Sequence, residues 1–261
     1  MPYADLDEIT LHYQDTGAGE PTLLLVHGWG GDLRVWEPLD FRDHRTVAVD
    51  LRGHGRSSAP RHGYRPGDLA GDLAQLLPRL GAGPVVAIGH SMGAQVVTAL
   101  AVEHPALVTA LVVIDPAYGA DDEEAGGFHD RLARLRAEGA AAALDPPIPL
   151  PPGVRDQVLA TPGPVLAACY AGLYTEPGAF GARPASERYL ARRRCPVLCL
   201  RARAEPSVWE AALPAPPGSR VEAWAGSGHF LHLEHPARTI RLITDWLDRL
   251  PKEKQPPHTS G

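Results

Sequence analysis

The stretch Pro84-Val-Val-Ala-Ile-Gly-His-Ser-Met-Gly93 carries the strongest structural signal in the chain. Its apolar start is typical of a buried strand, and residues 92–103 favour a helix that stops before Pro105. Between them lies a Gly-x-Ser-x-Gly pattern, whose tight turn needs small residues beside the serine and holds its hydroxyl above the strand end. The start of the helix adds a partial positive charge. We therefore predict that Ser91 is a nucleophile; the alternative is a glycine-rich turn in which Ser91 caps the helix.

Apolar runs of similar length lie on both sides of this stretch. Runs that are apolar on both faces are typical of a parallel sheet covered by helices on each side. Residues 68–80 and 240–250 place apolar side chains at helical spacing. The alternation predicts an α/β fold with a doubly wound, mostly parallel sheet, opened by an antiparallel strand at residues 10–13. The runs are Thr22–Val26, Thr46–Val49, Leu111–Ile114, Pro196–Leu200 and the weaker Val221–Trp224.

The alternation of strands and helices breaks between residues 117 and 193. This segment contains an Arg- and Ala-rich helix at residues 131–143 and a proline run at residues 146–152. We predict a core of residues 1–116 and 194–250, with a small helical cap of residues 117–193 inserted after the strand that ends at Ile114. A surface excursion without function is the alternative. The polar tail, residues 251–261, is predicted to be disordered.

Charge and hydropathy disfavour several classes of partner. The formal net charge is -6 and the pI is about 6.0, so the surface repels phosphate and we expect no nucleic-acid partner. No run reaches the roughly 18 apolar residues that span a bilayer, and the acidic N-terminus lacks the apolar core of a secretory signal. We expect no membrane contact, a cytoplasmic location, a small-molecule substrate, and a monomer or homodimer.

The cysteines do not suggest a metal site or a disulfide framework. There are three of them, Cys169, Cys195 and Cys199, and no two form a Cys-x-x-Cys pair. We predict that they are small core residues. No metal and no organic cofactor are expected.

A serine hydroxyl needs a base that takes its proton. Of the twelve histidines, His229 is the best placed, in Gly226-Ser-Gly-His-Phe230 between the last predicted strand and the closing helix. From that loop it can reach back over the sheet edge to Ser91. His232 and His235 follow at spacings of three, but a loop does not align such spacings for a metal. We expect solvated or helix-capping roles for these two.

The acid that orients the base is ambiguous in the sequence. Glu205 follows the strand at residues 196–200 and is the only acid at a suitable offset there. Asp115 directly follows the strand that ends at Ile114. Either loop can approach His229, and we favour Glu205. The alternatives without function are a surface charge paired with a nearby arginine for Glu205 and a loop-forming residue for Asp115.

An oxyanion needs two preorganised N–H groups. One is expected from the backbone of Met92, the residue after the nucleophile. The other is expected from Trp29, in the loop His27-Gly-Trp-Gly-Gly31 after the first parallel strand. The indole of Trp29 and apolar side chains of the cap are predicted to line the substrate pocket. The remaining candidates for this pocket are Gly28, Tyr118, Phe128, Tyr170, Leu173, Tyr174, Phe180 and Phe230.

Four motifs together resemble the α/β-hydrolase superfamily, and in particular its bacterial esterase, lactonase and carbon–carbon hydrolase branch. They are His27–Gly30, Asp50–Ser57, Gly89–Gly93 and Gly228–Phe230. The resemblance covers residues 10–250 and implies the roles given above for Ser91, His229, Met92 and Trp29.

The chain departs from the superfamily's pattern at the acid. The usual Gly-x-x-Asp is replaced here by a segment with Ala202 and Glu205, while some members take the acid from the strand that here precedes Asp115. The serine nucleophile separates the chain from the haloalkane dehalogenases and epoxide hydrolases, which attack with aspartate.

The resemblance implies a serine hydrolase that cleaves a small or medium apolar carboxylic ester or lactone through an acyl-enzyme on Ser91. A carbon–carbon hydrolase, and a biosynthetic thioesterase or cyclase, would use the same triad. A ligand receptor with little turnover, on the same fold, is the alternative from a different class.

Overall fold

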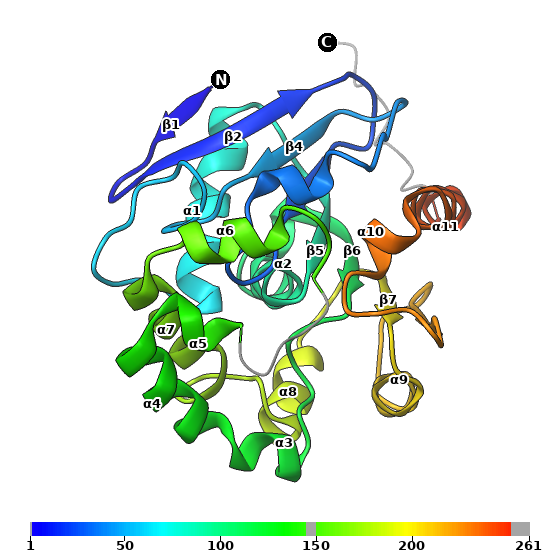
Figure 1. Cartoon of the computed structure of the whole chain (residues 1–261). Coiled ribbons are helices and arrows are strands. Elements are labelled where there is room, and N and C mark those ends of the chain that lie inside the picture. Colours follow the sequence, from blue (N-terminus) through cyan, green and yellow to red (C-terminus); the bar gives the residue numbers. More distant parts are fainter. Residues whose placement is uncertain (1, 145–149, 252–261) are drawn as a thin grey trace.

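Figure 1 shows the computed structural model, which describes residues 2–144 and 150–251. In these residues, eight strands form one sheet in the order β1-β2-β4-β3-β5-β6-β7-β8. β2 pairs antiparallel with β1 and with β4, and the remaining neighbours are parallel. The strands are β1 (Tyr3–Asp5), β2 (Thr10–Thr16), β3 (Leu23–Val26), β4 (Thr46–Val49), β5 (Val85–His90), β6 (Val108–Ile114), β7 (Val197–Arg201) and β8 (Arg220–Ala223).

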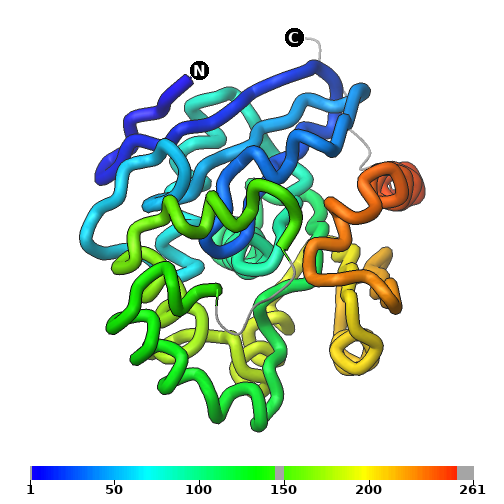
Figure 2. Tube along the Cα trace, viewed as in Figure 1, coloured from blue at the N-terminus to red at the C-terminus, as the bar shows by residue number. Residues whose placement is uncertain are grey.

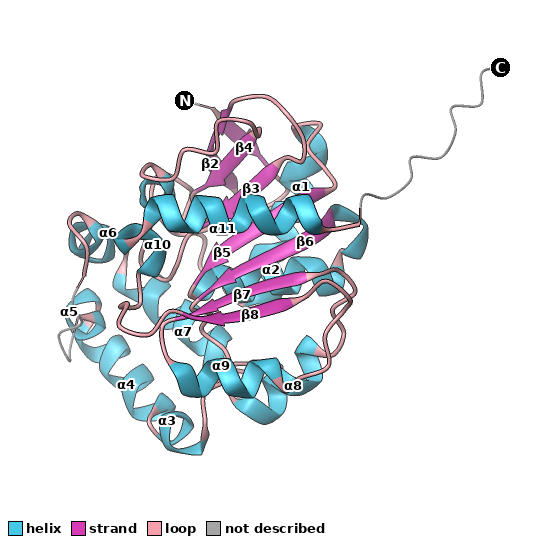
Figure 3. Ribbon diagram, turned by 90° about the vertical axis from the view of Figure 1, so that its right-hand side faces the viewer, coloured by secondary structure: helices cyan, strands magenta, loops and turns pink. Residues whose placement is uncertain are grey.

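Helices cover both faces of this sheet. α1 (Pro66–Arg79) and α2 (Met92–Glu103) pack against each other on one face, while α11 (Pro236–Arg249) crosses the other face, toward the viewer in Figure 3. The predicted α/β fold with a doubly wound, mostly parallel sheet is therefore confirmed. Shorter helices link the strands: η1 (Leu33–Trp36), η2 (Pro105–Leu107), α9 (Ala204–Ala211) and α10 (Leu231–Glu234).

Successive side chains of each central strand point to opposite faces of the sheet, and this divides the core into two layers. In β3, Leu24 and Val26 face the layer that contains α1 and α2, whereas Leu23 and Leu25 face the layer that contains α11. All four side chains are buried, as expected for a strand covered on both faces. This arrangement explains why the strands read as unbroken apolar runs.

The predicted central strands match the observed ones to within a few residues. Several short elements were not predicted, and β1 and α9 are two of them. β1 is a short edge strand with little apolar signal, and Tyr3 in it is 53% exposed. The segment after β7, which was read as a loop, folds into α9. The cysteines are buried and unbonded, as expected.

The segment between β6 and β7 is helical in its described part, and Figure 2 traces most of it in green at the lower part of the molecule. Gly139 has a φ of 63° and separates α4 from α5, so the single helix predicted at residues 131–143 is two. The helices are α3 (Asp122–Gly126), α4 (Phe128–Glu138), α5 (Ala140–Ala143), α6 (Val154–Ala160), α7 (Gly163–Tyr174) and α8 (Arg183–Leu190).

Some sequence predictions stay predictions. Most of the proline run, residues 146–149, and the tail, residues 252–261, lie outside the described residues. The boundaries of a separate cap at residues 117–193 are likewise still an expectation. None of the helices in the described ranges combines the length and hydropathy that a membrane span needs.

Candidate active site

Ser91 stands on a strained turn between β5 and α2. Its backbone has φ of 52° and ψ of -116°, a region that residues other than glycine rarely adopt. A Cβ on Gly89 would collide with the Gly93 carbonyl oxygen, and a Cβ on Gly93 with that of Val26. Only glycine fits on either side of the serine, as the Gly-x-Ser-x-Gly pattern predicts.

Backbone contacts from the end of β6 fix this turn. The N–H of Ser91 donates to Ile114 O at 2.9 Å, and the N–H of Ala117 donates to Ser91 O at 3.2 Å. Ser91 occupies the N-cap position of α2, but its side chain makes no capping hydrogen bond. In the part of the chain that the structure describes, its hydroxyl has no hydrogen-bond partner. The alternative of a helix cap is therefore contradicted.

The loop after β3 is held by His27. Its Nδ1 donates to Gly28 O at 2.8 Å, and its Nε2 accepts the N–H of Leu51 at 2.9 Å, so both ring nitrogens are committed in the neutral tautomer. Burial lowers the pKa of His27, which favours that neutral form. A Cβ on Gly28 would lie 2.9 Å from Nδ1 of His90 and 3.2 Å from Cβ of Ser91. Glycine is therefore needed where this loop approaches Ser91.

The two predicted oxyanion donors have free backbone N–H groups. Among residues 2–144 and 150–251, neither the N–H of Trp29 nor that of Met92 donates to a protein acceptor. For Met92 this follows from its place in the first turn of α2, where the N–H groups have no intrahelical partner. The indole Nε1 of Trp29 donates to Leu166 O at 2.9 Å and ties the loop to α7.

His229 contacts a carboxylate from β6. Nδ1 of His229 lies 2.7 Å from Oδ2 of Asp115, which directly follows the strand and has a φ of 40°. The other carboxylate oxygen accepts the N–H of Ala202 at 3.1 Å, and the Asp115 N–H donates to Leu200 O at 2.7 Å. Because a carboxylate only accepts, Nδ1 of His229 carries the proton and Nε2 is left as the acceptor.

Asp115 stays ionised next to this imidazole. Burial would raise the pKa of its carboxyl, but the hydrogen bond and charge of His229, the Ala202 N–H and the charge of Arg201 outweigh burial and lower the pKa below its usual value. A group with these contacts can hold the imidazole in one orientation and stabilise its charged form.

The preference for Glu205 as the acid is contradicted by this geometry. The chain turns into α9 at Ala204, so Glu205 lies in the first turn of that helix and its carboxylate pairs with Arg183. Its side chain is 63% exposed. The reading of Glu205 as a paired surface charge was correct in kind, although the partner comes from α8 and not from β7.

Ser91 and His229 line one cavity of about 110 Å³. The loop after β3 borders it through Gly28 and Trp29, and Phe230 lies beside His229 in the lining. The described contacts include no hydrogen bond between Ser91 and His229, and in unliganded sites this bond is often long. The rest of the lining is apolar apart from His90 and comes from Gly31, Val35, Ala143, Leu144, Leu150, Val154 and Val158.

Five aromatic residues predicted for this cavity lie elsewhere. Tyr118 is buried against α9, where its hydroxyl donates to Glu210 at 2.7 Å. Phe128, Tyr170 and Tyr174 pack on one another between α4 and α7, and Tyr170 meets the Trp29 ring edge-on at 6.3 Å. Tyr170 thus packs against Trp29, and none of the three rings lines the cavity. Leu173 is in the core, and Phe180 stacks on Tyr189 at 3.9 Å.

His90, whose role the sequence did not reveal, links three parts of the site. Its Nε2 donates to His229 O at 2.9 Å, its ring lies 4.6 Å from that of His229, and its Nδ1 faces Gly28. Burial lowers the pKa of His90 well below its usual value, so the ring is neutral. The signal that could have found it is its place beside Ser91 in the turn.

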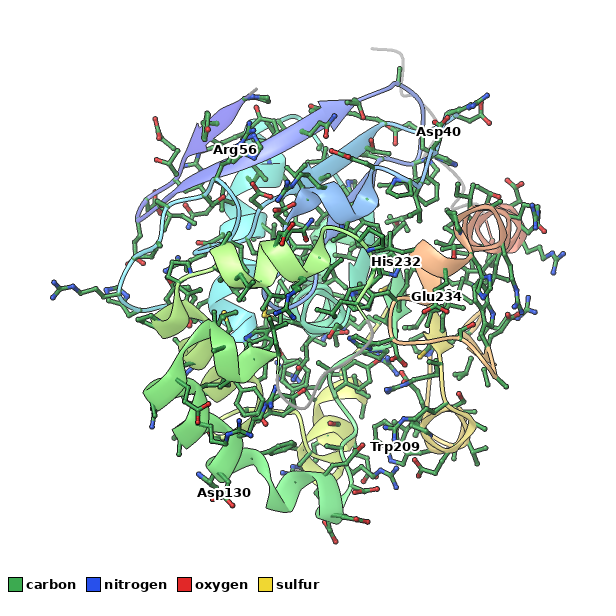
Figure 4. The ribbon with its side chains drawn as sticks, in the orientation of Figure 1. Asp40, Arg56, Asp130, Trp209, His232 and Glu234 are labelled. Atoms are coloured by element: carbon green, nitrogen blue, oxygen red, sulfur yellow. The ribbon has the colours of Figure 1, made fainter. Side chains whose placement is uncertain are left out.

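The loop that carries His229 is held by α10, where Figure 4 labels His232 and Glu234. Both carboxylate oxygens of Glu234 accept the N–H of Gly228, at 3.0 and 2.9 Å. His232 is fully buried between the rings of Trp36 and His90, so the expectation of a solvated role is wrong for it. His235 is exposed, as expected, although its side chain makes no capping bond.

The buried histidines predict acid sensitivity. Burial lowers the pKa of His54 and of His232 from 6.5 to about 3. The unfolded chain therefore takes up protons below pH 6.5 that the folded chain does not, and stability falls with pH by up to about 1.4 kcal/mol per pH unit for each of these histidines. His27 and His90, whose pKa burial also lowers, add to the slope. Urea unfolding between pH 7 and pH 5 measures this slope.

The variant His232→Phe is expected to reduce that slope by about a quarter, because one of the four buried histidines with a lowered pKa no longer titrates. His129→Gln, at an exposed position on α4, is the control and should leave the slope unchanged. An unchanged slope in His232→Phe would contradict the assignment.

Comparison with known proteins identifies the family of the chain. Residues 21–160 match the family model described as alpha/beta hydrolase fold. A 2-(acetamidomethylene)succinate hydrolase of Mesorhizobium japonicum is 40% identical over 114 residues, which are 42% of this chain and 41% of that protein. The chain therefore matches less than half of this curated relative's length.

Solved structures cover nearly the whole chain. An enol-lactonase from Burkholderia xenovorans superimposes with a TM-score of 0.78 at 22% identity, over 95% of this chain and 100% of that one. A thermophilic esterase from Thermogutta terrifontis, with malate bound, gives a TM-score of 0.76 at 26% identity over 92% and 94%. With a family model that matches more than half of its residues, the chain belongs to the α/β-hydrolase fold family.

Proposed function

We propose that the chain is a serine hydrolase that cleaves a carboxylic ester or lactone through an acyl-enzyme on Ser91. The observation that carries this proposal is the 2.7 Å contact between His229 and Asp115, because it leaves Nε2 of the imidazole as an acceptor in the cavity that Ser91 lines.

In this mechanism, Nε2 of His229 takes the Ser91 proton while Oγ attacks the carbonyl carbon. The tetrahedral oxyanion accepts hydrogen bonds from the N–H groups of Trp29 and Met92. Collapse breaks the ester C–O bond, and His229 gives its proton to the departing alkoxide. Water, deprotonated by His229, then attacks the acyl-enzyme, and the carboxylic acid leaves with Ser91 restored.

The cavity favours a short, uncharged acyl group. At about 110 Å³ it is smaller than the 300–1,000 Å³ typical of pockets for drug-sized ligands. Its described lining contains no Lys or Arg, which a negatively charged acyl group would need as a partner. The substrate class proposed here therefore differs from the succinate derivative in the name of the Mesorhizobium relative.

The test is turnover of p-nitrophenyl acetate and butyrate, together with covalent trapping by an alkyl fluorophosphonate. We expect saturable hydrolysis of both esters and one phosphonate adduct, located on Ser91 by peptide mass spectrometry. No turnover of any ester or lactone tested, with no adduct on Ser91, would contradict the proposal.

A change in the cavity wall is expected to change chain-length preference. Val158 of α6 lines the cavity, and Val158→Ala removes two methyl groups from its wall. We expect kcat/KM for hexanoate relative to butyrate to rise about tenfold, because one methylene in a hydrophobic pocket is worth 1–3 kcal/mol. The neighbouring Leu159, 46% exposed and outside the cavity, gives the control Leu159→Ala, for which the ratio should not change. An equal change in both variants would argue against this wall.

A further inference from the structure

A buried ionic cluster lies next to the loop that carries Asp115. Arg201, the last residue of β7, is 4% exposed, and its guanidinium donates to Pro116 O at 3.1 Å and to Tyr118 O at 3.3 and 3.4 Å. The same guanidinium donates to Oε2 of Glu210, on α9, at 3.1 and 2.7 Å. The Arg201 side chain thus connects β7 and α9 to the backbone carbonyls of Pro116 and Tyr118, which follow shortly after Asp115.

Glu210 closes the cluster from the side of α9. Its Oε1 accepts the Tyr118 hydroxyl at 2.7 Å and Nη1 of Arg193 at 3.4 Å, and the Cys199 thiol lies 3.1 Å from Oε2. Burial would raise the pKa of Glu210, but the charges of Arg201 and Arg193 and these hydrogen bonds lower it, so the carboxylate stays ionised.

The cluster acts where the backbone needs support. Asp115 has a φ of 40°, which costs free energy for a residue with a Cβ, and such conformations persist only where the surroundings fix them. Arg201 holds the chain that follows Asp115. Ala202, which comes directly after Arg201 in the sequence, donates its N–H to Oδ1 of Asp115. Both the carboxylate and the loop behind it are therefore anchored to the end of β7.

Stability alone does not explain such a cluster. Well-packed apolar side chains of similar volume are often as stabilising as a buried ion pair, or more so. A guanidinium is the side chain that can reach two carbonyls and a carboxylate in one plane. Trp209 of α9, labelled in Figure 4, donates its indole N–H to Glu187 of α8 and takes no part in the described ionic contacts of Arg201 and Glu210.

We propose that Arg201, Glu210 and Tyr118 are positioning residues that hold the Asp115 loop so that its carboxylate meets Nδ1 of His229. This rests on the proposed function for the role of Asp115, but the contact itself is independent of any substrate. Tyr118, predicted from sequence to bind substrate, instead holds the Asp115 loop through its contacts with Glu210 and Arg201.

The experiment compares Tyr118→Phe and Glu210→Gln with the wild type in the full chain. Tyr118→Phe removes one hydroxyl and keeps the ring, and Arg203→Gln, an exposed neighbour of Arg201, is the control. We expect kcat for p-nitrophenyl butyrate to fall about threefold to tenfold in Tyr118→Phe and about tenfold to a hundredfold in Glu210→Gln, with KM within twofold. Arg203→Gln should match the wild type.

A spectroscopic readout separates positioning from folding. A histidine N–H bonded to a carboxylate gives a far-downfield proton resonance, which Asp115→Ala should abolish. We expect this resonance to shift or broaden in Tyr118→Phe and in Glu210→Gln, and to stay in place in Arg203→Gln. If both cluster variants fold and keep the wild-type resonance and kcat, the positioning role is overturned, whatever their Tm.

The same readout distinguishes the two proposals. Absence of ester turnover with a resonance that responds to the cluster variants would overturn the proposed function and support the positioning role. Ester turnover by the wild type, with the same resonance and kcat in the cluster variants, would support the proposed function and overturn the positioning role.

Discussion

Ser91→Ala is expected to lower kcat/KM for short esters by about 10⁵-fold, because every step of the proposed reaction passes through the Ser91 oxygen. The fold should survive, since the hydroxyl has no protein partner among the described residues and the turn is fixed by backbone bonds to β6. Initial rates at high enzyme concentration, with Tm measured in parallel, check both statements. Retention of more than a few per cent of the activity would identify another nucleophile.

The same position should reveal stored backbone strain. At φ of 52° and ψ of -116°, a Cβ is unfavourable, so Ser91→Gly is expected to be about 1 kcal/mol more stable than Ser91→Ala, although both are inactive. At Ala94 in α2, Ala→Gly should change stability in the opposite direction, because glycine weakens a regular helix. A less stable Ser91→Gly would mean that the turn is not strained.

Asp115→Asn is the second large effect, with an expected fall in kcat of about 10⁴-fold. The amide has the shape of the carboxylate, but it carries no charge and can donate as well as accept a hydrogen bond. The proton of the imidazole is therefore no longer held on Nδ1, and the charged form of the imidazole is no longer stabilised. KM should change little, because Asp115 does not line the cavity. Steady-state kinetics over a pH series measures the split between kcat and KM.

Glu205→Gln is the matched control for this acid. It makes the same chemical change on the adjacent strand connection, where the carboxylate pairs with Arg183 at the surface. We expect kcat within twofold of the wild type. The opposite ranking, with Glu205→Gln inactive and Asp115→Asn active, would show that the loops rearrange when substrate binds.

The sequence predicted the sheet because each central strand is apolar on both faces. Leu23 to Val26 are buried whichever layer they face, so hydropathy alone identifies the strand. The turn that carries Ser91 was predictable for a similar reason, since backbone collisions that no side chain can avoid require the glycines on both sides of the serine.

The acid was not predictable in this way. The ends of β6 and β7 are neighbours in the sheet, so Asp115 and Glu205 begin at comparable places. The choice depends on where α9 begins and on the N–H of Ala202, and these are tertiary details that no local pattern encodes. Sequence spacing placed Glu205 in a loop, whereas the helix turned it toward Arg183.

The cavity was misjudged for a related reason. Tyr170 and Tyr174 are aromatic residues of a kind often found in binding sites. However, α7 packs against α4, and that contact turns their rings toward Phe128. Helical rotation decides which face of a cap helix meets substrate, and the apolar spacing of α7 runs all round the helix. Small aliphatic residues such as Val158 line the cavity instead.

The backbone hydrogen bond between Ser91 and Ile114, at the end of β6, also determines which of the residues Ser91, Asp115 and His229 can move. Ser91 and Asp115 belong to one hydrogen-bonded frame, because Ser91 donates to the residue that precedes Asp115. Their separation is fixed by the register of two paired strands. His229 alone comes from a segment outside the sheet, held by His90 and Glu234. Of the three proposed catalytic residues, only His229 can therefore shift without disturbing the strand pairing, and we expect conformational exchange at this site to be confined to its ring and its loop.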